Sequence, residues 1–88
     1  MADIRIKTEI ADGKTATVWI FCTNDIADKM IDTLREMFTV EMMQAAISKR
    51  WDKTYIKIET EQVEKVNRIR QGMTQAWIDF SVAKPSNN

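Results

Sequence analysis

The side chains best suited to chemistry are cations and aromatic rings interleaved in the second half of the chain. A nucleic-acid surface uses cations to neutralise phosphates and rings to stack on bases. Residues 49–88 carry eight basic and five acidic side chains (net +3), whereas residues 1–48 carry five and eight (net −3). The nucleic-acid-binding residues predicted from this pattern are Lys49, Arg50, Lys53, Tyr55, Lys57, Lys65 and Arg68. Because acidic residues lie among them and the whole chain is neutral, nucleic-acid binding is the alternative prediction rather than the leading one.

An acidic series in the first half of the chain is the second candidate for chemistry. It consists of Asp25, Asp28, Asp32 and Glu36. Oxygen ligands of a divalent cation must all lie about 2.0–2.6 Å from the ion. Carboxylates spread over three helical turns cannot do so, and we therefore expect a solvated helix face and no metal site.

Residue types that are rare or missing exclude several classes of enzyme. The chain has no histidine, one cysteine (Cys22) and two glycines, Gly13 and Gly72. A Cys/His zinc site, a Ser–His or Cys–His pair and a glycine-rich phosphate loop therefore cannot be assembled. We expect no catalytic residues and no cofactor, and we expect Cys22 to be a small buried apolar residue.

The first element that would position these side chains is a β-hairpin. Residues 4–10 alternate between apolar and charged side chains, residues 15–22 are rich in β-branched and aromatic side chains, and Asp12-Gly13 favours a type I′ turn between them. With a two-residue loop, Ile6 would face Trp19. The face that carries Trp19 and Phe21 is then predicted to be the core face.

Two helices are predicted to follow the hairpin, with a break between them at Thr39. The first begins at Thr23-Asn24-Asp25, and its apolar stripe is Ile26, Ala27, Met30, Ile31, Leu34, Met37 and Phe38. The apolar line of the second helix, residues 40–50, lies on a different face, and one continuous helix is the alternative. That line is Val40, Met43, Ile47 and Trp51, and Met42 lies well away from it. Because a small core cannot cover both, the predicted partner-binding residues are Met42, Met43, Ile47 and Trp51. For Trp51 itself, a core position at the end of the helix is the preferred interpretation.

The last third of the chain predicts a strand and a helix. Residues 54–59 alternate as a strand, and a helix capped by Thr60 carries apolar residues at steps of three and four as far as Phe80. Gly72 leaves an alternative open, in which the helix ends at Gln71 and residues 74–82 form a strand. The helix is preferred because Ile78 alone departs from its stripe.

Together these elements predict an α+β fold in the order ββααβα, with a small antiparallel sheet and helices packed on one face. We expect a single domain over residues 1–82 and a frayed tail over 83–88. No family resemblance is evident, and the first residues lack the pattern of a signal peptide, so we expect a cytoplasmic protein. The leading functional prediction is a small non-catalytic regulator or inhibitor that binds another protein and self-associates as a homodimer. Its size suits an accessory protein of a phage or mobile element, with no membrane partner.

Overall fold

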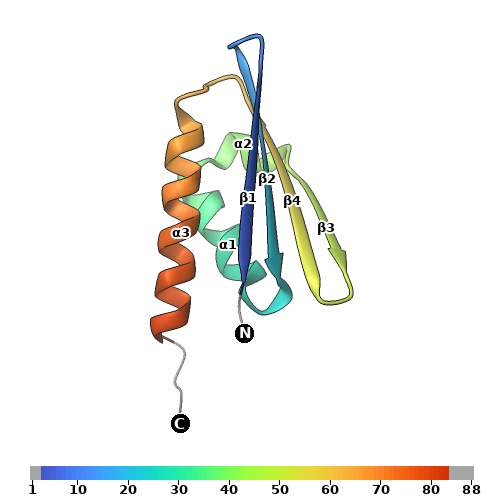
Figure 1. The fold of residues 1–88 in the computed structure, drawn as a ribbon, viewed down its shortest axis with the longest axis vertical. Helices are drawn as coiled ribbons and strands as arrows, with labels where there is room; N and C mark the ends of the chain where they lie inside the picture. The colour runs from blue at the N-terminus through green and yellow to red at the C-terminus, as the bar shows by residue number, and fades with distance from the viewer. Residues whose placement is uncertain (1–2, 84–88) are drawn as a thin grey trace.

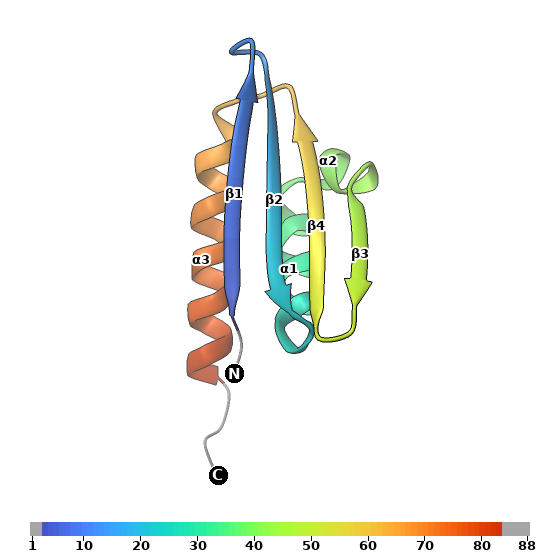
Figure 2. The same cartoon turned by 45° about the vertical axis from the view of Figure 1, so that its right-hand side comes forward.

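In the computed structural model, which describes residues 3–83 apart from the side chains of Met43 and Ala83, three helices cover one face of a four-stranded antiparallel sheet (Figure 1 and Figure 2). The elements in chain order are β1 (Ile4–Ala11), β2 (Thr15–Thr23), α1 (Asn24–Met37), α2 (Thr39–Met43), β3 (Ala46–Arg50), β4 (Lys53–Thr60) and α3 (Lys65–Ala83). The strands lie in the order β1-β2-β4-β3. The predicted α+β class is confirmed, and the observed order ββααββα contains one strand more than predicted.

The hairpin of β1 and β2 forms with a register one residue away from the predicted one. Asp12 and Gly13 both have positive φ, at 56° and 65°, and the Lys14 amide donates to the Ala11 carbonyl, as a type I′ turn requires. However, Ala11 pairs with Thr15, so Lys14 is an extra residue in the loop and Ile6 pairs with Ile20 rather than with Trp19. A shift of one residue moves every side chain of β2 to the opposite face.

The core therefore lies on the face opposite to the predicted one. The buried side chains of β2 are Ala16, Val18, Ile20 and Cys22, and β4 adds Ile56 and Ile58. Against them pack the buried side chains of α1, which are Ile26, Ala27, Met30, Ile31 and Leu34 as the helical stripe predicted, and those of α3, which are Val66, Ile69, Met73 and Ala76. The prediction that the Trp19 and Phe21 face is the core face was wrong.

The region from residue 38 to residue 50 contains the largest departure from the prediction. The predicted break is confirmed, because α1 ends at Met37 and Phe38 leaves the helical conformation with φ −140° and ψ 63°. The second helix, however, ends at Met43, and residues 46–50 form the edge strand β3 rather than a helix. Every residue of β3 is exposed, so this strand lacks the alternation of buried and exposed residues that reveals a strand in a sequence.

The last strand and helix are confirmed, with different limits. Thr60 ends β4 instead of capping the helix, and α3 begins at Lys65. α3 continues through Gly72 to Ala83, which excludes the alternative strand over residues 74–82. Gly72 lies where α3 and α1 approach closely, because a Cβ atom there would come within 2.8 Å of the Met37 sulfur. The predicted tail lies outside the described residues except for Ala83.

Candidate functional site

The candidate site is the face of the sheet opposite the helices. In the part of the chain that the structure describes, all three helices pack on the other face, as Figure 2 shows most clearly. We call the uncovered surface the open face. Its side chains are Arg5, Lys7 and Glu9 of β1, Thr17, Trp19 and Phe21 of β2, Lys53, Tyr55, Lys57 and Glu59 of β4, and Ala46, Ser48 and Arg50 of β3.

The register aligns these side chains in rows across the strands. One row joins Arg5, Phe21, Tyr55 and Ser48. The rings of Phe21 and Tyr55 meet edge to face, with their centroids 5.3 Å apart and an interplanar angle of 80°. Aromatic pairs favour this geometry because the positive edge of one ring faces the negative face of the other. The two central strands thus present a continuous, half-buried aromatic surface at this level.

The neighbouring row joins Lys7, Trp19 and Lys57. The Lys7 ammonium nitrogen lies 5.3 Å from the centroid of the Trp19 ring, within the range of a cation–π interaction. Each aromatic row therefore has a cation on β1, Arg5 beside Phe21 and Lys7 beside Trp19, and Lys57 of β4 lies on the other side of Trp19.

Charge changes sign along the strands. The row beyond Trp19 joins Glu9, Thr17 and Glu59, whereas the row beyond Phe21 joins Thr23, Lys53 and Arg50. Lys57 and Glu59 form an ion pair at 3.4 Å, but both side chains are about half exposed or more, at 47% and 63%. Such a pair contributes little stability, and both groups stay available to a ligand.

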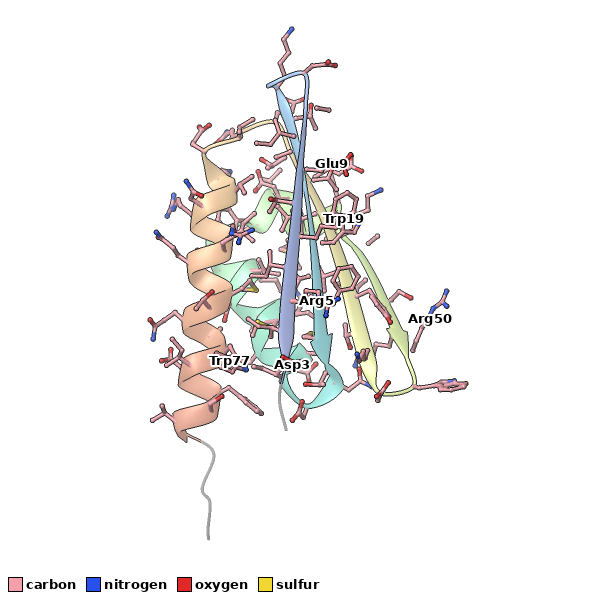
Figure 3. The ribbon with its side chains drawn as sticks, in the orientation of Figure 1. Asp3, Arg5, Glu9, Trp19, Arg50 and Trp77 are labelled. Carbon is pink, nitrogen blue, oxygen red and sulfur yellow. The ribbon has the colours of Figure 1, made fainter. Side chains whose placement is uncertain are left out.

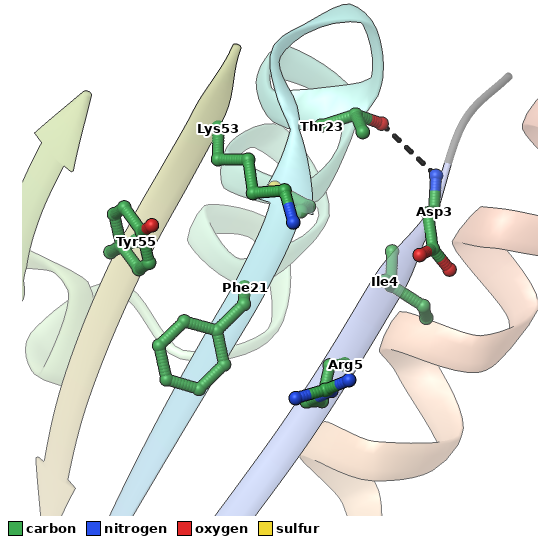
Figure 4. Close-up of a pocket in the computed structure, with 8 residues that line it drawn as sticks. Asp3, Ile4, Arg5, Phe21, Thr23, Lys53 and Tyr55 are labelled. Atoms are coloured by element: carbon green, nitrogen blue, oxygen red, sulfur yellow. Dashed lines mark hydrogen bonds between the residues drawn. The ribbon is translucent and has the colours of Figure 1, made fainter. Parts of the chain in front are cut away.

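A hollow of about 300 Å³ opens at the basic end of the open face (Figure 4). It is lined by Asp3, Ile4, Arg5, Phe21, Cys22, Thr23, Lys53 and Tyr55. The amide of Asp3 donates to the Thr23 hydroxyl at 3.0 Å, and the Thr23 amide donates to the Asp3 carbonyl at 3.1 Å, which fixes the start of β1 against the end of β2. Both Arg5 and Lys53 border this hollow, beside the Phe21 and Tyr55 rings.

The structure divides the predicted nucleic-acid residues between two sides of the molecule. Arg50, Lys53, Tyr55 and Lys57 lie on the open face, whereas Lys49 pairs with Thr54 and belongs to the other face of the sheet. Lys65 and Arg68 are on α3, where they approach the Phe38 ring at 5.5 Å and 5.9 Å.

Lys65 also has a structural partner on that helical side. Its ammonium donates to the Glu41 carboxylate at 2.9 Å, and the two side chains are only 22% and 12% exposed. This hydrogen bond holds the pKa of Glu41 below its usual value, against the opposing effect of burial. The pair ties α2 to α3 and lies apart from the open face.

The predicted partner-binding residues do not form one surface, because the helix that would align them ends at Met43. Met42 is buried in the core at 8% exposure, and the side chain of Met43 lies outside the described part of the structure. Ile47 is 41% exposed on β3. Trp51 is 100% exposed in the turn between β3 and β4, so the prediction of a core position for Trp51 was wrong.

The single cysteine lies in surroundings that suppress its reactivity. Cys22 is buried, and desolvation together with the nearby charge of Asp25 raises the pKa of its thiol to about 11. A thiol with so high a pKa is a poor nucleophile at neutral pH. Among the described residues, no cluster of three or more acidic or cysteine side chains could hold a metal ion. In the same part of the chain, no helix is both long and apolar enough to cross a membrane.

Sequence reasoning missed the half of the site that lies on the hairpin. Trp19 and Phe21 are predicted to lie in the core, and Arg5 and Lys7 are not among the predicted site residues. The signal that could have found them is that β2 is apolar on both sides from Val18 to Cys22, so one side had to remain uncovered or find another partner. Figure 3 shows Arg5, Glu9 and Trp19 on the strands of this face, with Arg50 on the edge strand.

Comparison with protein-family models, curated proteins and solved structures finds no match for this chain.

Proposed function

We propose that this chain is a non-catalytic binding module that holds single-stranded nucleic acid on the open face of its sheet. The observation that carries the proposal is the arrangement of rings and cations in adjacent rows of one uncovered surface. Trp19, Phe21 and Tyr55 occupy the two central strands, and Arg5, Lys7, Lys53 and Lys57 lie beside them. Single strands bind where bases can stack on aromatic rings while cations neutralise the phosphates.

The spacing of the rows supports the same conclusion. Successive rows on one face of a sheet are two residues apart, about 6.7 Å along a strand. This step is close to the distance between phosphates in an extended single strand. A strand laid along β2 and β4 would therefore bring one base to the Trp19 row and the next to the Phe21–Tyr55 row.

The test is the binding of a fluorescein-labelled oligothymidylate of ~12 nucleotides, followed by fluorescence polarisation over a range of salt concentrations. We expect binding at low salt that weakens as salt rises, because each phosphate contact to a single strand contributes a slope of about −0.7 in log K against log salt. Absence of binding at low salt, or affinity independent of salt, overturns the proposal.

Matched variants distinguish binding at the open face from a general effect of the protein's charge. Arg5→Ala and Lys53→Ala should each reduce the salt slope by about 0.7, whereas Arg35→Ala, on the exposed side of α1, should leave it unchanged. Trp19→Leu keeps an apolar side chain in β2 and removes the ring, and it should weaken binding about 5-fold or more, the equivalent of one lost stacking contact. Far-UV circular dichroism checks that each variant is folded.

A second candidate function is self-association through the same face, the homodimer of the leading sequence prediction. The specific observation in its favour is the charge gradient along the strands. If two sheets stack face to face with their strands antiparallel, Glu9 and Glu59 of one copy lie opposite Lys53 and Arg50 of the other, with the rings between them. Aromatic groups surrounded by a charged rim are typical of protein interfaces.

Light scattering coupled to size exclusion measures this second function directly. A dimer that persists at high salt and dissociates in the Trp19→Leu variant would support it. A monomer at high protein concentration overturns it and leaves the open face accessible to nucleic acid.

A further inference from the structure

The turn between β3 and β4 holds a tryptophan in an unfavourable backbone conformation. Arg50 pairs with Lys53, so the loop is only Trp51 and Asp52. Trp51 has φ 46°, in the left-handed region that is uncommon for residues other than glycine, asparagine and aspartate. Glycine is the usual residue at such a position of a two-residue hairpin loop. The side chain is 100% exposed and gains no burial in return.

Hydrogen bonds from the start of α1 hold this turn in place. The side-chain amide of Asn24 donates to the Trp51 carbonyl at 2.6 Å, and the backbone amide of Asn24 donates to the Asp52 carbonyl at 3.1 Å. The Thr54 hydroxyl, which is fully buried, donates to the Asn24 side-chain oxygen at 2.6 Å. The indole of Trp51 is therefore carried on a rigid support rather than on a mobile loop. A backbone fixed in advance loses less conformational entropy when a ligand binds to the side chain that it carries.

The surroundings of Trp51 join the open face. A hollow of about 520 Å³ is lined by Lys49, Arg50, Trp51, Asp52 and Tyr55. Tyr55 also lines the hollow at the basic end of the open face, together with Arg5 and Lys53. Tyr55 thus lines both hollows, and Lys49 and Arg50 line the one beside Trp51 together with Asp52.

We infer that Trp51 is a further stacking residue, which holds a base of the single strand as that strand leaves the open face past Arg50 and Lys53. This inference rests on the proposed function and extends it by stating where the bound nucleic-acid strand leaves the open face. Binding then accounts for the strained turn, because the turn presents the exposed indole next to the row of Lys53 and Arg50. Strained conformations that the surrounding structure enforces are concentrated at binding sites.

The test compares two lengths of fluorescein-labelled oligothymidylate, ~3 and ~12 nucleotides, since stacked sites of this kind span about 4–16 nucleotides. The shorter strand can occupy the aromatic rows alone, whereas the longer one also reaches Trp51. We expect Trp51→Ala and Trp51→Gly to weaken binding of the longer strand about 10-fold and to leave the weak binding of the shorter one unchanged, because one stacked base is lost. Val82→Ala, which shortens another exposed apolar side chain, is the control and should change neither.

A second readout follows the ring itself. In the double variant Trp19→Phe, Trp77→Phe, which keeps an aromatic ring at position 19, Trp51 is the remaining tryptophan. Its emission should be quenched at concentrations of the ~12-nucleotide strand where polarisation shows that this variant is bound. If the wild type binds the longer strand but the Trp51 variants bind it equally well, or the emission stays constant, the inference is overturned and the proposed function stands. If the wild type binds neither strand, both are overturned. Capture of a second copy by wild-type protein but not by Trp51→Ala would also overturn the inference, by assigning Trp51 to a protein interface.

Discussion

Replacing Trp51 by glycine should make the protein more stable, although it removes the largest side chain of the turn. A left-handed conformation costs an L-residue about 1–2 kcal/mol, and glycine avoids this cost. Glycine in turn loses about 0.5–1 kcal/mol through the greater freedom of its unfolded chain. The side chain is fully exposed, so no packing energy is lost. The free energy of unfolding of Trp51→Gly should therefore rise by about 0.75 kcal/mol, the midpoint of a range of about 0–1.5 kcal/mol.

Urea denaturation followed by far-UV circular dichroism measures this change without depending on tryptophan fluorescence. The matching rise in Tm should be about 2–8 °C, given the usual scaling for a domain of this size. Trp51→Ala is the control, because alanine keeps the strain and also removes the ring, and its stability should stay within about 0.5 kcal/mol of the wild type. If Trp51→Gly is no more stable than Trp51→Ala, the backbone at Trp51 is not strained. The argument that the protein retains a strained turn in order to present this ring then fails.

Three further predictions concern the core and the helical side. Glu41→Gln should lower the free energy of unfolding by about 1–2 kcal/mol at pH 7 by weakening the bond from Lys65. Because the pKa of Glu41 is lowered in the folded state, this contribution is present above the ordinary value of 4.5 and is lost as the pH falls below it through the lowered pKa, so urea titrations should show wild type and variant converging at acidic pH. Alkylation of Cys22 at pH 8 should be at least ~100-fold slower in the native than in the unfolded protein, since a thiol pKa of about 11 rather than 9.0 leaves a hundredth of the thiolate; equal rates would contradict the burial. Gly72→Ala should raise the free energy of unfolding by up to about 1 kcal/mol through helix propensity, because the Cβ atom meets only the flexible end of Met37; a lower Tm would show that Met37 cannot move.

The elements with strong periodic patterns could be predicted from the sequence. The stripe of α1 from Ile26 to Leu34 is buried as its spacing requires, and the helix breaks at Phe38, next to the position where the apolar stripe changes phase. The alternation of β4 is equally clear, with Ile56 and Ile58 in the core. In each of these elements one face is apolar and the other polar, so the sequence admits a single orientation.

The register of the hairpin could not be predicted, because β2 is apolar on both faces. Either face of Val18 to Cys22 could serve as the core, and the choice depended on whether Lys14 lies inside the loop. The observed positive φ of Asp12 and Gly13 is compatible with either register, so turn chemistry alone does not decide between them. A strand of this kind specifies its register only through what packs against it.

The same ambiguity explains why the site was found only in part. The cations and the ring of β4 could be recognised along the chain, because Lys53, Tyr55 and Lys57 alternate within one strand. Their partners Arg5 and Trp19 are more than 30 residues away in sequence and join them only through the pairing of β1 with β2 and of β2 with β4. Charge counted along the chain could not reveal this surface either, because the cations of β1 belong to the acidic half of the sequence.

The neutrality of the whole chain is therefore no argument against a nucleic-acid surface. The net charge of the chain is an average over two opposite sides of the molecule. The acidic residues Asp28, Asp32 and Glu36 lie on α1, on the far side of the molecule from the open face. At the distance of a ligand on the open face, exposed charges on the opposite side lie beyond about 8 Å and are largely screened at physiological salt. A bound strand experiences the local rows of rings and cations. Glu9 and Glu59 make one end of these rows acidic, whereas at the other end Arg5, Lys53 and Arg50 outnumber Asp3 and Asp52. This asymmetry predicts that a strand is held towards the basic end, where Lys53, Arg50 and Trp51 lie.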